Sequence, residues 1–253
     1  MPYLKRVVKA GNTIFVKKYY SSRYGRKNKD LRAERQNVSS EKMQRVNEEN
    51  AVEKLTWLIN TNFGAGDIHV VLTYDDEHLP DTEGAKENMR KFIRKLRAVY
   101  RENGAELKYI KTAEYEGKRI HHHLLLNKID TQIINELWTY GRAFFRVLDN
   151  SGDYSKLASY FVKETNSTFA QGLVSGKRWD SSKNLKKPEI SRIIVAADSW
   201  TKEPKPAKGF YIPSDSIESD IDSFGYAFQK YMMIKIPEKK KRGKTAGKST
   251  AER

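Results

Sequence analysis

The 253-residue sequence contains no cysteine, which excludes disulfide bonds and thiolate metal sites. It has no apolar run that approaches transmembrane length and no secretory signal at its N-terminus. These absences predict a soluble, cytoplasmic protein without a membrane partner. A His-Glu-x-x-His motif and the paired cysteines of nucleobase deaminases are also missing, which disfavours a zinc protease and a deaminase.

A phosphate-binding loop is absent as well. Gly243-Lys244-Thr245 and Gly247-Lys248-Ser249 look like the end of such a loop, but neither has the glycine that should stand five residues earlier. No strand is expected before them and no helix after them. The sequence therefore predicts no nucleotide cofactor and no ATPase or helicase activity of its own.

Acidic residues are outnumbered, with 32 Asp and Glu against 48 Lys and Arg and a net charge of +16. This balance favours a polyanionic partner, with nucleic acid as the leading candidate. From Lys5 to Arg35 there are eleven Lys and Arg, two acids and three interleaved tyrosines. Such a run is usually a solvated surface, but the tyrosines add stacking surfaces that suit DNA. The residues assigned to DNA contact here are Lys17, Lys18, Tyr19, Arg23, Arg26 and Lys27.

Hydrophobic periodicity and turn signals predict a mixed chain of helices and strands. Strands are expected at 4–20 (a hairpin), 68–74, 107–115, 120–127, 143–148, 190–196 and 226–236. Helices are expected from Ser39 or Ser40 to 60, and at 82–102, 131–140 and 155–164. Residues 166–190 read as a long loop, and the basic tail from Pro237 as disordered. The central order predicts an α+β, ferredoxin-like (split βαβ) antiparallel sheet with helices on one face and the other face open for a substrate.

The triplet His121-His122-His123 lies in one of the expected strands. Side chains alternate along a strand, so His121 and His123 share a face and can share a divalent metal. Glu114 is placed across a tight strand connection as a third ligand, and His122 is assigned to packing. The alternatives are histidines that stabilise a sheet edge, or a structural zinc site, which would require four closed ligands.

Tyr160 and Lys163 are three residues apart in an expected helix, so they lie on the same side of it. A phenol near a metal-bound phosphate can attack it, with Lys163 beside the developing charge. An isolated Tyr-x-x-Lys is usually structural, but here it follows the His121 and His123 pair, which favours a functional interpretation. Tyr154, at the start of the same helix, is the alternative nucleophile.

The strand that ends in Leu72-Thr73-Tyr74 leads into Asp75-Asp76-Glu77-His78-Leu79-Pro80. Such a strand is most often core, but Thr73 and Tyr74 at its exit can reach DNA at the sheet edge. The acids and His78 are conceivable metal ligands.

Together, the Leu-Thr-Tyr strand exit, the His-x-His strand and the Tyr-x-x-Lys helix resemble motifs one to three of the HUH endonucleases. The likeness covers residues 65–165 and is greatest to rolling-circle replication initiators of microviruses and of Gram-positive plasmids or integrated elements. Leu72 to Pro80 and the segment from Glu114-Tyr115 to His121 carry it. Ile120 and Val71 depart from the usual proline and threonine, but neither is a proposed catalytic group.

The resemblance implies Mg²⁺ or Mn²⁺ at His121, His123 and Glu114. It implies that Tyr160 nicks and rejoins single-stranded origin DNA or an origin hairpin in a bacterial host, leaving a 5′-phosphotyrosine and a free 3′-OH. A host helicase and polymerase would then be partners, and Arg119 is a further expected DNA contact. A single-tyrosine HUH transposase, a mobilisation relaxase and a non-enzymatic nucleic-acid-binding module on the same fold remain as alternatives.

Four regions are expected on this basis. They are a basic hairpin-and-helix extension (1–63), the HUH endonuclease domain (64–165), a C-terminal loop and β-containing extension (166–236) and a disordered basic tail (237–253).

Overall fold

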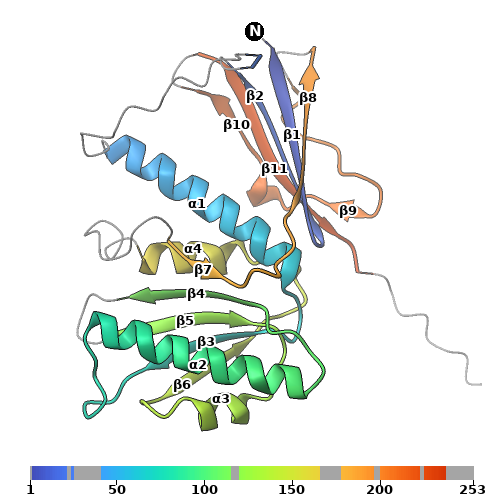
Figure 1. Ribbon diagram of the computed structural model, residues 1–253. Coiled ribbons are helices and arrows are strands. Elements are labelled where there is room, and N and C mark those ends of the chain that lie inside the picture. Colours follow the sequence, from blue (N-terminus) through green and yellow to red (C-terminus); the bar gives the residue numbers. More distant parts are fainter. Residues whose placement is uncertain are drawn as a thin grey trace, which may run out of the picture.

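The structure is a computed structural model that describes residues 2–21, 24–25, 41–114, 120–165, 178–196, 200–222 and 225–237. It stacks two antiparallel sheets with helices between them (Figure 1). Helices α1 and α4 lie between the upper sheet and the central sheet, and α2 and α3 cover the other face of the central sheet. Of the expected disordered tail only Pro237 falls within the described residues.

The central sheet has the strand order β6-β3-β5-β4-β7, with every neighbouring pair antiparallel. Its elements, in chain order, are β3 (Ile68–Thr73), α2 (Thr82–Glu102), β4 (Tyr109–Glu114), β5 (His121–Leu126), α3 (Thr131–Leu137), β6 (Ala143–Val147) and β7 (Asp180–Ser181). Strands β3 and β4 are therefore parallel on either side of β5, as are β5 and β6 on either side of β3. These two interlocked split βαβ units confirm the expected α+β fold class.

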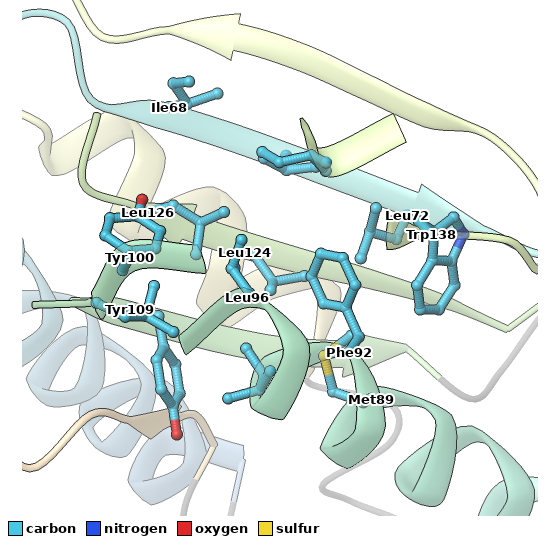
Figure 2. Close-up of a cluster of buried hydrophobic side chains, with 14 of the residues drawn as sticks. Ile68, Leu72, Met89, Phe92, Leu96, Tyr100, Tyr109, Leu124, Leu126 and Trp138 are labelled. Carbon is cyan, nitrogen blue, oxygen red and sulfur yellow. The ribbon is translucent and has the colours of Figure 1, made fainter. Parts of the chain in front are cut away.

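The core on one face of this sheet lies under α2 and α3 (Figure 2). Leu124 and Leu126 of β5 meet Phe92 and Leu96 of α2, whose apolar residues recur at helical spacing. Asp81 caps α2, because its carboxylate accepts a hydrogen bond from the Gly84 N–H at 2.7 Å. The two helices of the split βαβ units thus share one face, as predicted.

The opposite face is not open along its length, which corrects the expectation from the sequence. Helices α1 (Glu41–Asn62) and α4 (Ser155–Glu164) pack on it. Leu125 of β5 faces this layer, where Leu55 of α1 and Phe161 of α4 are buried. The part of this face beneath α1 and α4 is therefore not available to a substrate.

Helix α1 buries residues on two sides rather than along one stripe. Leu55 faces α4, whereas Trp57 packs against Val8 of the upper sheet. Met43 and Val46, nearer its N-terminus, are 48% and 43% exposed. The helix buries side chains along the part that lies between the two sheets.

The upper sheet joins the N-terminal hairpin to strands from the C-terminal region, in the order β10-β11-β2-β1-β8, with β9 also pairing with β11. Its elements are β1 (Tyr3–Ala10), β2 (Thr13–Tyr20), β8 (Glu189–Val195), β9 (Phe210–Tyr211), the short 3₁₀ helix η1 (Ser214–Ser216), β10 (Glu218–Ile221) and β11 (Ala227–Lys235). The hairpin and the two later strands were expected, but their union in one sheet was not. Gly11 in the hairpin turn has φ +57°, and a Cβ there would lie 1.9 Å from the carbonyl oxygen of Asn60. Glycine is thus required where the hairpin meets α1.

Candidate active site

Four side chains of metal-binding type meet where β4, β5 and α4 come together. Glu114 ends β4, His121 and His123 begin β5, and Glu164 ends α4; one ligand atom from each lies within 4.8 Å of all the others. Glu114 is directly opposite His121 in the strand register, and its Oε2 is 3.0 Å from His121 Nε2. The residues predicted as ligands are thus brought together, with a fourth from the helix.

His123 is the innermost member of this cluster. It is 1% exposed, and among the described residues neither of its ring nitrogens has a hydrogen-bond partner. Burial, reinforced by His121 and His69, lowers the pKa of His123 to about 3. A neutral imidazole with an unused nitrogen is a good ligand for a divalent metal, so the residues present fit such an ion.

His122 faces the other way, as strand alternation predicts. It lies under α2 and α3, and its Nε2 is 3.0 Å from the Tyr74 hydroxyl. Its pKa is lowered to about 3, chiefly by burial. His122 is therefore a packed and hydrogen-bonded core residue.

Tyr160 is on α4, beside the histidines. Its ring centroid is 5.1 Å from that of His123, and the side chain is 40% exposed. Burial, and then the charges of Glu164 and Glu114, raise its pKa. Lys163 is exposed one turn later. The phenol is thus reachable from solvent and next to the metal-type cluster.

Residues 67–165 match the family described as replication-associated protein ORF2/G2P. The match spans β3 to α4 and contains all four members of the metal-type cluster and Tyr160, in agreement with the resemblance to HUH-type initiators. Neither a curated protein nor a solved structure gives a significant match to the chain. No described helix is long and apolar enough to cross a membrane.

Tyr154, the alternative nucleophile, is the N-cap residue of α4. It is 6% exposed, and its hydroxyl donates to the Asp149 carbonyl oxygen at 2.8 Å. Burial raises its pKa to about 12. Because the Tyr154 side chain is buried and its hydroxyl is already hydrogen-bonded, it is less accessible to a DNA phosphate than Tyr160.

Thr73 and Tyr74, at the exit of β3, face opposite sides of the central sheet. Thr73 is opposite His121 in the register, so it shares the cluster's face. Tyr74 is 2% exposed in the core and hydrogen-bonded to His122, a position that disfavours its predicted contact with DNA. Gly141 packs so closely here that a Cβ would lie 2.4 Å from the Thr73 carbonyl oxygen.

The basic residues of the N-terminal hairpin are divided between the faces of the upper sheet. Lys17 lines a cleft between this sheet, α1 and α4, and Tyr19 shares its face by alternation. Lys18 is on the other face, with its Nζ 5.4 Å from the Trp200 ring centroid. The other predicted DNA contacts lie outside the described residues: Arg23, Arg26, Lys27 and Arg119.

Glu164, His69 and Thr112 were missed in reading the sequence. Glu164 follows Tyr160 by four residues, a spacing that places two side chains on one helical face. His69 stands two residues before Val71, which pairs with His123, and Thr112 pairs with His123 from β4. The helical spacing was readable in advance, but the strand register that assembles His69 and Thr112 was not.

Proposed function

We propose that the chain is an HUH-type initiator of rolling-circle replication that nicks and rejoins single-stranded origin DNA. The observation that carries the proposal is the group formed by Glu114, His121, His123 and Glu164 with the Tyr160 ring 5.1 Å from His123. A nucleophile beside a site for a phosphate-binding cation is what in-line transfer of a phosphodiester requires. The family match supports the replication role.

In the proposed reaction, the Tyr160 hydroxyl oxygen attacks the phosphorus of a DNA phosphodiester. The new bond joins the tyrosine oxygen to phosphorus, and the bond from phosphorus to the 3′ oxygen breaks. The tyrosine loses its proton and the departing 3′ oxygen gains one, leaving a 5′-phosphotyrosine and a 3′-OH. Attack by a 3′-OH on the phosphotyrosine reverses these changes and rejoins the strand.

Lys163 is assigned to the phosphate, because its ammonium lies one helical turn from Tyr160. Glu114, His121, His123 and Glu164 would hold Mg²⁺ or Mn²⁺. When bound, such an ion would polarise a phosphate and offset the charges of Glu164 and Glu114, which raise the pKa of Tyr160. Tyr154 is not assigned a chemical role, because its hydroxyl is already bonded.

The DNA on either side of the nick is assigned to two surfaces. Thr73 borders the cluster at the end of β3. The second surface is the cleft of about 630 Å³ beside α4, whose lining includes Lys17, Phe15 and Ser159, the residue before Tyr160. Cationic and aromatic side chains together suit single strands, the first contacting phosphates and the second stacking on bases. Helicase and polymerase functions are assigned to host proteins.

The proposed organisation retains four regions. Residues 64–165 form the nuclease domain, flanked by 1–63 and 166–236 as extensions and 237–253 as a basic tail. The two extensions supply the strands of the upper sheet, which suits a shared role in holding DNA.

The test is covalent capture. The protein is incubated with labelled single-stranded DNA of random sequence and Mn²⁺, and SDS-resistant adducts are separated by gel. We expect an adduct that disappears in Tyr160→Phe and with EDTA, while DNA binding by Tyr160→Phe is retained. Sequencing the captured DNA then gives the preferred site.

Other outcomes distinguish the alternatives. Tight DNA binding without an adduct, also on hairpin substrates, would favour a non-enzymatic binding module on the same fold. Captured sequences from the ends of a transposable element would favour a transposase. Captured sequences from a plasmid transfer origin would favour a mobilisation relaxase. An adduct that persists in Tyr160→Phe would contradict the assignment of the nucleophile.

A further inference from the structure

Three buried side chains beneath the candidate active site have polar atoms with no hydrogen-bond partner among the described residues. They are His69 through Nε2, Thr112 through Oγ1, and His123 through both ring nitrogens. All three lie on the face of the central sheet that α4 covers. Buried polar groups are normally paired, so a cluster of unpaired ones indicates an interaction that is still to be completed.

Their arrangement follows from the strand register. Thr112 of β4 is directly opposite His123 of β5, and such cross-strand partners have Cβ atoms about 4.5–5.5 Å apart. His69 of β3 is on the other side of His123, with the ring centroids 5.7 Å apart and the ring planes inclined by 28°. His123 is therefore flanked by a hydroxyl on one side and by a stacked ring on the other.

A neutral imidazole has one N–H donor and one bare nitrogen. When the bare nitrogen binds a metal ion, the N–H remains inside the protein and needs an acceptor. Metal-binding histidines almost always donate this second hydrogen to a carboxylate, a backbone carbonyl or water, which fixes the orientation of the ring. The oxygen of a buried hydroxyl can accept such a hydrogen bond as well. Glu114 and Glu164 belong to the ligand group itself, so they are committed to the ion.

His69 and Thr112 are the two neighbours of His123 that also have buried polar atoms without a partner among the described residues, and the geometry distinguishes them. An imidazole N–H donates in the plane of its own ring. The rings of His69 and His123 are inclined by only 28° with their centroids 5.7 Å apart, and this near-parallel arrangement disfavours a hydrogen bond in the plane of the His123 ring. Thr112 approaches from the neighbouring strand, and its hydroxyl can accept a hydrogen bond.

We propose that Thr112 is a positioning residue of the metal site, and that its Oγ1 accepts the N–H of His123 while the other His123 nitrogen faces the ion. His69 packs on the ring face of His123 and restricts its rotation. This inference rests on the proposed metal site and adds to it the residue that selects the His123 tautomer. It does not depend on the nicking reaction.

The test is Mn²⁺ binding to the full chain by isothermal titration calorimetry, without DNA. Thr112→Val removes the hydroxyl at nearly constant shape, and Thr112→Ser keeps it. We expect Thr112→Val to weaken Mn²⁺ binding about 10–100-fold and Thr112→Ser to restore most of the wild-type affinity. Thr56→Val is the matched control, because the Thr56 hydroxyl is also buried but donates to the Val52 carbonyl oxygen within α1.

A second measurement separates positioning from packing. Without metal, Thr112→Val should melt at the same temperature as the wild type or higher, because it replaces an unpaired buried hydroxyl by a methyl group. With Mg²⁺ added, ¹⁵N-histidine NMR should show one His123 tautomer in the wild type and a mixture in Thr112→Val. A destabilised apo variant with an unchanged tautomer would overturn the proposal.

Three binding results would also overturn it. Equal loss in Thr112→Val and Thr112→Ser would reduce Thr112 to a packing residue. Unchanged affinity in Thr112→Val, with loss in His69→Phe, would move the acceptor to His69. A wild-type chain that binds no Mn²⁺ would remove the metal site and this inference with it, whereas Mn²⁺ binding without a DNA adduct would contradict only the nuclease function.

Discussion

His122 and His123 are consecutive, both buried in the central sheet, and face opposite layers. On the side of α2, the Nε2 of His122 is 3.0 Å from the Tyr74 hydroxyl. On the side of α4, neither ring nitrogen of His123 has a partner among the described residues. Burial lowers the pKa of both to about 3, so the protonation state does not distinguish them.

The difference between them is hydrogen-bond pairing, which is present at His122 and absent among the described residues at His123, the proposed metal ligand. The face of His122 is filled by aromatic and aliphatic side chains that also satisfy its polar atom. The face of His123 brings Glu114, His121 and Glu164 within 4.8 Å and leaves the imidazole unsatisfied. A protein tolerates such an unsatisfied group where a ligand completes it.

The largest effect is expected from removing the unpaired histidine. His123→Ala should weaken Mn²⁺ binding by about 100-fold or more, beyond what the loss of a supporting residue costs, and abolish the DNA adduct. Isothermal titration calorimetry and the adduct gel measure the two effects. Wild-type adduct formation in His123→Ala would contradict the metal site.

The opposite result is expected on the other face. His122→Ala should lower the free energy of unfolding by about 2–4 kcal/mol, because it leaves a cavity and removes the hydrogen bond between His122 and the Tyr74 hydroxyl. Urea denaturation measures the loss, with Mn²⁺ affinity as the control that should stay unchanged. Loss of Mn²⁺ binding in His122→Ala would contradict the assignment of His122 to the core and of the metal site to the opposite face.

Strands β3 to β6 of the central sheet could be predicted from the sequence because their signals are local, whereas β7 lies in residues 166–190, which were expected to form a loop. The alternation in Ile120 to Leu126 assigned His121 and His123 to one face, and the helical pattern of α2 marked its buried side. The order of these elements predicted the split βαβ plan that the structure confirms.

The upper sheet could not be predicted, because its pairings join distant parts of the chain. Lys18 of β2 donates to the side chain of Gln229 in β11, 211 residues later, and no local pattern encodes that register. The same limit applies to Tyr74, whose place in the core depends on Trp138 and His122. Local pattern assigns a side chain to a face, but the partners on that face come from tertiary packing.

Stability should depend on pH through the buried histidines on both faces. Burial lowers the pKa of His69 to about 4 and that of His122 and His123 to about 3, against about 6.5 in the unfolded chain. Below about pH 6.5 the unfolded chain takes up protons that the folded chain does not, so each histidine removes up to about 1.4 kcal/mol of stability per pH unit. This loss continues until the pH reaches the folded pKa, and above 6.5 these groups add no pH dependence.

Urea denaturation with EDTA at pH 7.5, 6 and 5 measures this slope. His69→Phe should make the slope shallower by about one proton per molecule. Equal stability of the wild type at pH 7.5 and 5, or an unchanged slope in His69→Phe, would argue against the buried neutral state.

A smaller effect is expected for Glu164→Gln, which keeps the shape of the side chain but removes its charge. Because Glu164 is one of four ligand-type groups, the loss of its charge should weaken Mn²⁺ binding about tenfold. Calorimetry measures it, with the exposed Glu136→Gln on α3 as a control that leaves binding unchanged. Unaltered affinity in Glu164→Gln would reduce the site to the three ligands expected from the sequence.

The smallest effect is expected at Tyr154. Like the two histidines, Tyr154 and Tyr160 differ in whether their polar group already has a hydrogen-bond partner in the core. The Tyr154 hydroxyl donates to the Asp149 carbonyl oxygen, whereas Tyr160 is 40% exposed beside His123. Tyr154→Phe should therefore cost only the net value of one hydrogen bond, about 0.5–1.5 kcal/mol in urea denaturation, and leave the adduct intact. Loss of the adduct in Tyr154→Phe, together with its survival in Tyr160→Phe, would reverse the roles of the two residues. In that case, the presence or absence of a hydrogen-bond partner would not distinguish structural from functional residues on this face of the sheet.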